Sequence, residues 1–92
     1  MSIAFHVTLV EICQVEGPAA PDLRVGSRWR TGNLLFQAAE PGESLQGLHE
    51  AWALARDGQG RVFLIWRADH PRARGLVIQP LDSRYCYELS PA

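Results

Sequence analysis

Cysteine and histidine are the residue types in this chain that could act as a nucleophile and a base. The candidates are Cys13 with His6 or His49, and the neighbouring pair Asp69-His70. A thiol and an imidazole must meet in space and the thiol must ionise, which burial in a strand opposes. Nothing beyond residue type supports such a pair. We therefore expect that the protein is not an enzyme.

The same residue types lack the spacing of a metal site. The three histidines and two cysteines form no CxxC or HxxxH pair, and such pairs are the usual signature of zinc ligands. Gly58 and Gly60 precede a predicted strand instead of opening a helix, so they do not form a phosphate-binding loop. We therefore predict no metal and no cofactor.

Arginine supplies all nine basic side chains, and no lysine is present. Guanidinium groups make bidentate contacts with carboxylates and phosphates. The arginines gather in two places, around Arg28 and Arg30 and in the stretch WRADHPRARG, which contains Arg67, Arg72 and Arg74. The net charge is −1, and the pI near 6.3 is lower than the value above about 9 of a dedicated nucleic-acid domain. An acidic protein surface is therefore the first hypothesis for their ligand, and a phosphate backbone the second.

The elements that position these residues follow from hydrophobic periodicity. Between predicted strands, residues 44–57 place apolar side chains on one half of a helical wheel, with a proline-containing start and an Asp-Gly end. We predict an α+β fold of order β-β-α-β-β-β, in which one helix packs on a mostly antiparallel, curled sheet of four to six strands. The predicted strands are residues 1–13, 25–38, 61–67, 75–81 and 85–89.

Alternation along the strands assigns side chains to faces. Around Arg28 and Arg30 it places the intervening tryptophan on the face opposite to both arginines, so either the tryptophan is buried and the arginines are exposed, or the reverse. In the hairpin we pair Arg67 with the glycine at position 75, which leaves a seven-residue tip. Phe63 and Ile65 then lie on a second sheet face that is too apolar to be solvated. Either the sheet buries these side chains itself or a partner covers them.

Length and composition indicate one globular domain over residues 1–92. The longest apolar run, residues 62–66, is much shorter than the roughly 20 residues that cross a bilayer. The N-terminus lacks the basic and long apolar regions of a secretory signal. We expect a cytoplasmic protein without membrane contact, in which Cys13 and Cys86 are reduced thiols in the core.

These observations predict a small non-catalytic protein-interaction module, such as an inhibitor or accessory subunit of a larger protein or nucleoprotein assembly, or a homodimer formed through the second sheet face. The alternative is an RNA- or single-stranded nucleic-acid-binding module, in which the arginines hold phosphates and a tryptophan stacks on a base. The predicted partner-binding residues are Arg67, Arg72, Arg74, His70, Arg28, Arg30, Phe63 and Ile65.

Overall fold

The computed structural model of the protein describes residues 8–16, 23–38 and 52–92. Within these ranges the strands pair antiparallel in the order β1-β2-β6-β5-β4-β3. Because β3 also pairs with β1, the sheet closes into a barrel. The strands are β1 (Thr8–Val15), β2 (Arg28–Gln37), β3 (Ala53–Asp57), β4 (Val62–His70), β5 (Ala73–Pro80) and β6 (Tyr85–Pro91).

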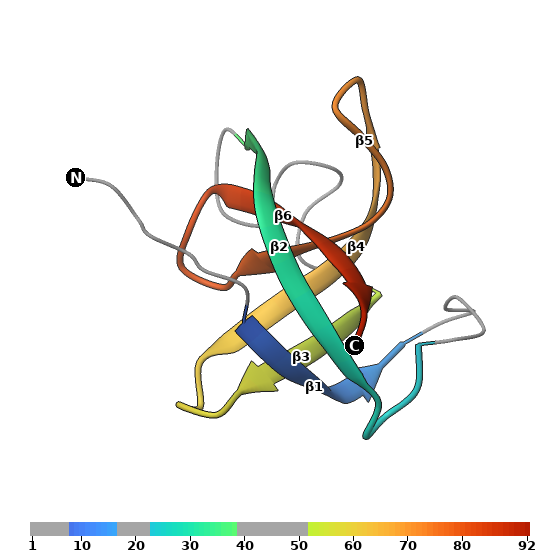
Figure 1. Cartoon of the computed structure of the whole chain (residues 1–92), viewed down its shortest axis with the longest axis vertical. Coiled ribbons are helices and arrows are strands. Elements are labelled where there is room, and N and C mark those ends of the chain that lie inside the picture. The colour runs from blue at the N-terminus through green and yellow to red at the C-terminus, as the bar shows by residue number, and fades with distance from the viewer. Residues whose placement is uncertain (1–7, 17–22, 39–51) are drawn as a thin grey trace.

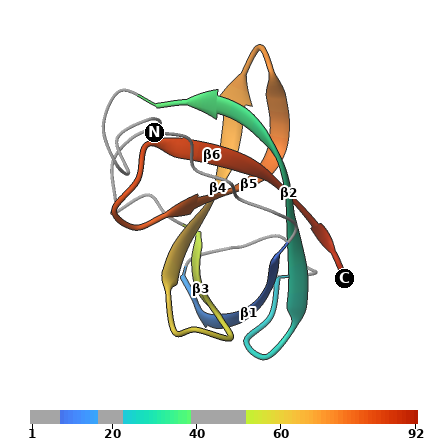
Figure 2. The same cartoon turned by 60° about the vertical axis from the view of Figure 1, so that its left-hand side comes forward.

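The barrel forms one small domain with a projecting arm. Figures 1 and 2 show the strands curving around a common interior, and the hairpin of β4 and β5 extending beyond it at one end. The C-terminal end of β2 extends toward the same end of the molecule. The β3–β4 turn and the start of β2 lie at the opposite end. The arginine-containing tip of the β4–β5 hairpin and the arginine-containing start of β2 therefore lie at opposite ends of the longest axis of the molecule.

Alternate side chains of each strand fill the barrel. On β1 these are Val10 and Ile12, and on β4 they are Phe63 and Ile65, all at most 1% exposed. Full burial of a side chain of this kind stabilises a fold by about 1.5 to 3 kcal/mol relative to leaving it exposed. The interior cluster consists of Val10, Ile12, Leu23, Trp29, Ala53, Ala55, Phe63, Ile65, Ile78 and Tyr87.

A second apolar cluster lies on the outer face of β4 and β5. The end of β2 contributes to it, because the ring of Phe36 meets Trp66 edge-on at 6.0 Å between centroids and stacks on His70 at 4.0 Å. Both faces of β4 are therefore buried, which explains its continuous apolar run. The cluster consists of Phe36, Ala38, Leu64, Trp66, Ala68, Val77 and Cys86.

Gln79 is a fully buried polar side chain beside this second cluster, with 0% of its surface exposed. The indole Nε1 of Trp66 donates to Gln79 Oε1 at 3.1 Å. Gln79 Nε2 in turn donates to the backbone oxygen of Ser83 at 2.7 Å. Both the oxygen and the nitrogen of the buried Gln79 amide therefore have a hydrogen-bond partner. The two bonds link β4 to the turn between β5 and β6.

The predicted α+β fold with a helix over residues 44–57 is wrong. The last five of these residues form β3, and the earlier ones up to residue 51 lie outside the described residues. Ala53 faces Ile65 across the ladder and Ala55 faces Phe63, so small side chains leave room for large ones inside the barrel. Alanine and leucine are good helix formers, but the preference amounts to less than about 1 kcal/mol per residue, and tertiary pairing outweighs it. The described part of the chain is all-β, and it holds no helix that could span a membrane.

The predicted register of the β4–β5 hairpin is wrong by one residue. Ala68, not Arg67, pairs with Gly75, and the connecting turn shortens to two residues. A shift of one residue exchanges the side chains that share a face. Since the sheet also closes, Phe63 and Ile65 point into the barrel. Of the two alternatives for these side chains, the structure has the one in which the sheet buries them itself.

Of the two face assignments that alternation left open in β2, the structure has the one that buries the tryptophan. Trp29 is 5% exposed and belongs to the interior cluster, whereas Arg28 and Arg30 are exposed. The register against β6 shifts at Gly32-Asn33, so this dipeptide marks a bulge within one strand. The bulge allows β2 to change direction and reach the outer cluster.

Candidate functional site

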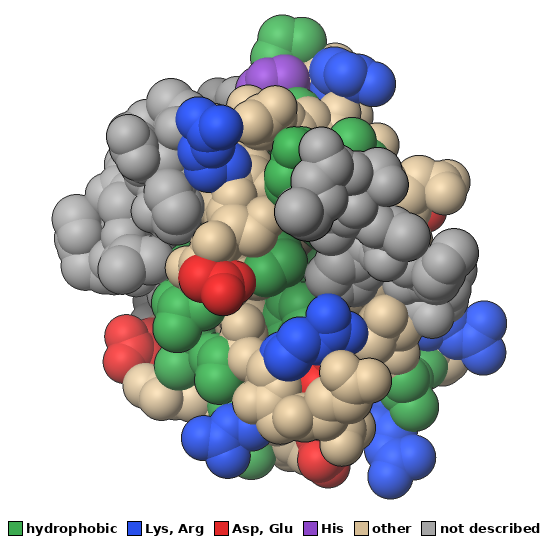
Figure 3. All heavy atoms as spheres, turned by 90° about the vertical axis from the view of Figure 1, so that its left-hand side faces the viewer, with side chains coloured by type: hydrophobic (Ala, Val, Ile, Leu, Met, Phe, Trp, Pro, Cys, Tyr) green, Lys and Arg blue, Asp and Glu red, His purple; other side chains and the backbone are tan. Residues whose placement is uncertain are grey.

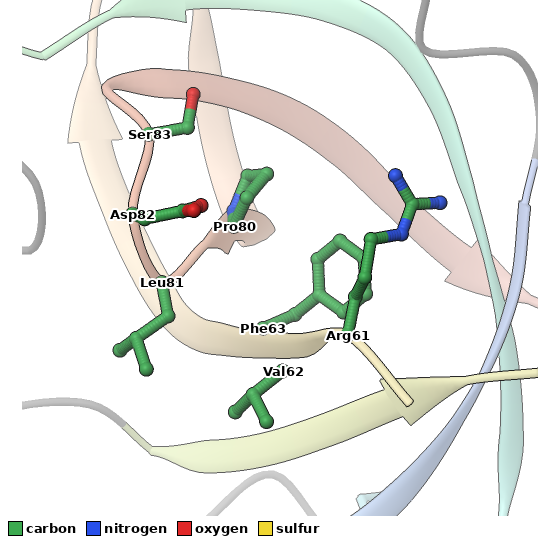
Figure 4. A pocket seen from close by; sticks show the side chains of 7 residues that line it. All are labelled: Arg61, Val62, Phe63, Pro80, Leu81, Asp82 and Ser83. Atoms are coloured by element: carbon green, nitrogen blue, oxygen red, sulfur yellow. The ribbon is translucent and has the colours of Figure 1, made fainter. Parts of the chain in front are cut away.

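An apolar pocket of about 450 Å³ lies between the start of β4 and the turn that joins β5 to β6. Its volume is within the range of about 300 to 1,000 Å³ that is usual for ligand sites. Phe63 closes the inner end, and the charged side chains of Arg61 and Asp82 stand at the rim (Figure 4). The lining residues are Arg61, Val62, Phe63, Pro80, Leu81, Asp82 and Ser83.

The rim arginine is held in place by the β3–β4 turn. Arg61 Nε donates to Asp57 Oδ2 at 2.7 Å, while the backbone amides of Gln59 and Arg61 donate to Asp57 Oδ1 at 2.9 and 3.0 Å. Gly60, with φ of +82°, lets the chain turn back within this short distance. The guanidinium of Arg61 also lies 5.7 Å from the centre of the Phe63 ring. These contacts orient Arg61 beside the pocket.

The carboxylate of Asp57 has a pKa below its ordinary value. Burial would by itself raise the pKa, since the side chain is only 2% exposed. Hydrogen bonds from the Arg61 side chain and from the amides of Arg61 and Gln59 outweigh burial and favour the charged form. The folded state therefore holds this carboxylate ionised at pH values where the unfolded chain binds a proton.

Asp57→Asn should lower the free energy of unfolding by about 1 to 3 kcal/mol at neutral pH, because it removes a charged acceptor of three hydrogen bonds. The contribution is complete above the unfolded pKa near 4 and is lost as the pH falls through the lower folded pKa. Urea unfolding at several pH values should therefore show the gap from wild type closing in acid. Asp82→Asn is the matched exposed control, and a gap that did not change with pH would contradict this account.

The other side of the pocket is a fixed turn that presents Leu81. The Leu81 amide donates to the oxygen of Val62 at 3.1 Å, and the Ser83 amide donates to the oxygen of Pro80 at 3.1 Å. Leu81 itself is 45% exposed. Figure 3 faces the side on which the β3–β4 and β5–β6 turns lie and shows hydrophobic side chains at the surface between acidic and basic ones. The surface here combines an apolar centre with a charged rim.

The hairpin arginines lie at the far end of β4 and β5 from this pocket. Arg67, Arg72 and Arg74 are all exposed, as predicted. The guanidinium of Arg67 lies 4.9 Å from the centre of the Trp52 ring. His70 has a structural role in the tip, because its Nδ1 accepts a hydrogen bond from the Arg72 amide at 3.1 Å and its ring stacks on the end of β2.

The two predicted arginine groups do not form one patch. The start of β2, with Arg28 and Arg30, and the tip of the β4–β5 hairpin lie at opposite ends of the molecule (Figure 1). Figure 3 likewise shows basic side chains spread over the surface. Phe63 and Ile65, predicted as partner contacts, are 0% exposed, so they are core residues of this structure. The structure instead brings Arg56 close to Arg28, on the two sides of β1.

The thiols occupy different environments. Cys86 is buried, and burial raises the pKa of its thiol to about 12, which keeps it protonated at neutral pH. Cys13 was predicted to be a core thiol, but it is exposed and its Sγ donates to the oxygen of Leu54 at 3.4 Å. Both cysteines are free. His6 and His49 lie outside the described residues, among which no three metal-ligating side chains gather.

Comparisons with protein-family models, with curated proteins and with solved structures returned no match to this chain. Sequence reasoning missed the pocket, whose walls come from two separate turns. The signal it offered was local: an apolar Leu81 directly before the polar pair Asp82-Ser83. Without the register, nothing placed that leucine beside Val62.

Proposed function

We propose that this protein is a small non-catalytic protein-interaction module that accepts an apolar side chain of its partner in the pocket at the start of β4. The observation that carries the proposal is the pocket itself, whose lining is mainly apolar, from Val62, Phe63, Pro80 and Leu81, with the charged Arg61 and Asp82 beside them. An apolar centre with a polar rim is the usual anatomy of a protein–protein interface. Aromatic side chains that fill such pockets commonly dominate the binding energy.

The rim determines what surrounds the inserted side chain. Arg61 is oriented by Asp57 and keeps 53% of its side chain exposed, so it can donate to a carbonyl or carboxylate of the partner. Asp82, on the other wall, can accept from a backbone amide or a basic side chain. These contacts suit a peptide segment with polar backbone groups on both sides of an apolar residue. An inhibitor or an accessory subunit of a larger assembly would use such a site.

A homodimer through an open sheet face loses its basis because the barrel closes. Nucleic-acid binding is the second candidate, carried by the exposed arginines. The stacking platform that it required is not available in Trp29 or Trp66, which are 5% and 4% exposed. Phosphate contacts carry no base recognition by themselves, and the half-buried ring of Trp52 already faces the guanidinium of Arg67. We therefore place a protein partner first, in a protein that we expect to be cytoplasmic.

Titration with N-acetyl-tryptophanamide and N-acetyl-leucinamide, followed by amide chemical shifts, tests the pocket directly. We expect weak, saturable binding with shifts concentrated at Val62, Leu81 and Ser83. Leu81→Asp should weaken that binding about tenfold, since a buried carboxylate would have to lose its water without a partner. Leu34→Asp is the matched control, because Leu34 is also about half exposed, at 52%, but does not line the pocket.

Two results would count against the proposal. Shifts that persist unchanged in Leu81→Asp would show that the probes bind elsewhere. Equal weakening by Leu34→Asp would show non-specific adhesion to exposed apolar groups. Either outcome would remove the observation that favours a protein partner.

A further inference from the structure

The outer face of β2, β1 and β3 carries a row of charged side chains created by the strand order. Glu11 in the middle strand pairs with Arg28 on one side and with Arg56 on the other. One step along the same face, Leu9 pairs with Arg30. All five side chains are exposed. We call this surface, made of Leu9, Glu11, Arg28, Arg30 and Arg56, the basic face.

The charges of the basic face are not balanced within the described residues. Three arginines stand against the single carboxylate of Glu11, and none of the three forms an ion pair there. Asp57 lies next to Arg56 in β3, but its carboxylate is committed to Arg61. The unpaired guanidinium groups can therefore bind external anionic groups, and guanidinium fits carboxylates in a bidentate manner.

A shallow depression of about 240 Å³ lies between the flanking arginines. Its walls include Arg28 and Arg56, and Glu11 and Leu9 also line it. Leu9 is 46% exposed, so its apolar side chain is accessible at this surface. The depression can therefore hold an apolar side chain against Leu9 while charged groups at both edges meet the arginines.

We infer that the basic face binds an acidic segment of a protein partner, with carboxylates on both sides of an apolar residue. This inference rests on the proposed function as an interaction module and names the chemistry of a second contact. Charge complementarity favours it, because carboxylates can reach Arg28 and Arg56 separately and avoid Glu11 between them. A continuous phosphate backbone would pass over that carboxylate, and the one hydrophobic side chain of the basic face is the aliphatic Leu9, so bases find no ring on this face on which to stack.

The partner binds this face through side chains. Strand β1 is already paired on both sides, with β2 and with β3, so its backbone has no open edge for an added strand. Specificity then depends on where the carboxylates lie relative to the apolar residue. The attraction between exposed charges should weaken as salt is added.

Fluorescence anisotropy with a labelled peptide of glutamates flanking a central leucine tests the inference, with oligothymidylate of equal charge as the second probe. We expect the peptide to bind at low salt and to bind more tightly than the oligonucleotide. Arg28→Glu and Arg56→Glu should each weaken peptide binding about tenfold, because each replaces an attraction by a repulsion. Arg74→Glu is the matched control, since it makes the same charge change at the hairpin end of the molecule.

Glu11→Gln gives the sharpest readout. It removes the only carboxylate of the basic face and should tighten peptide binding several-fold, a gain that a merely structural role would not produce. The inference is overturned if wild type does not bind the peptide at low salt, if oligothymidylate binds more tightly, or if Arg74→Glu weakens binding as much as Arg28→Glu. Failure here leaves the pocket titration unaffected, so the two proposals can fail separately.

Discussion

Phe63→Ala should lower the free energy of unfolding by about 3 to 5 kcal/mol, the usual cost of deleting a buried aromatic ring. Phe63 is 0% exposed and is the largest of the fully buried side chains in the described residues. It packs inside the barrel opposite Ala55, whose small side chain cannot fill the space that the ring leaves. For a domain with a total stability of about 5 to 15 kcal/mol, this loss is a large share. Urea unfolding followed by tryptophan fluorescence measures it.

Leu81→Ala is the matched control for Phe63→Ala. Leu81 lines the same pocket but is 45% exposed, so its truncation should change the stability by only about 0.5 kcal/mol. If Phe63→Ala instead left the stability unchanged and only reduced probe binding, Phe63 would be a surface contact, as the sequence predicted. The pair of variants thus separates a core role from a binding role for residues at the two ends of one pocket.

Gln79→Leu should lower the free energy of unfolding by about 2 to 4 kcal/mol, although leucine is apolar and of similar size. The substitution leaves two buried polar groups without partners, the indole N–H of Trp66 and the backbone oxygen of Ser83. An orphaned buried donor or acceptor costs about 1 to 3 kcal/mol. The same unfolding measurement applies, with Gln37→Leu, an exposed glutamine in β2, as the control.

A double-mutant cycle with Trp66→Phe isolates the indole contribution. Phenylalanine has no N–H, so Gln79→Leu should cost about 1 to 2 kcal/mol less in the Trp66→Phe background than in wild type. Strictly additive costs would mean that the hydrogen bond between Trp66 and Gln79 contributes no coupling. The cycle also tests whether the turn that carries Leu81 depends on this network, because Gln79 holds the oxygen of Ser83.

The candidate site was only partly predictable. Local alternation placed Trp29 on the face opposite to its neighbouring arginines, and the structure exposes Arg28, Arg30, Arg67, Arg72 and Arg74. Their grouping did not follow, because cross-strand neighbours depend on the order of strands in the barrel. Glu11 and Arg56 are far apart in the sequence and meet because β1 pairs with β3. The pocket depends on the same non-local pairing, since the first residues of β4 meet the turn after β5.

The helix prediction failed for a related reason. The segment around Ala53 and Ala55 fits a helical wheel, and it fits a strand equally well when small residues are needed opposite Phe63 and Ile65. Intrinsic preferences of a few tenths of a kcal/mol per residue could not decide between the two. Closure of the barrel decided it, because a strand in this place pairs with β1 and with β4 at once.

The sequence by itself determined the antiparallel character of the sheet, the positions of the later strands and the placement of Trp29 on the face opposite to its two neighbouring arginines. These properties depend on period-two alternation and turn residues, which act over a few positions. The tertiary structure alone decided the closure, the register of β4 and β5, and which charges share a face. Alternation along a strand shows which residues share a face. It does not show which face points into the barrel when both faces are apolar. In β4 both are apolar, because Phe63 and Ile65 fill the barrel while Leu64 and Trp66 are buried in the outer cluster.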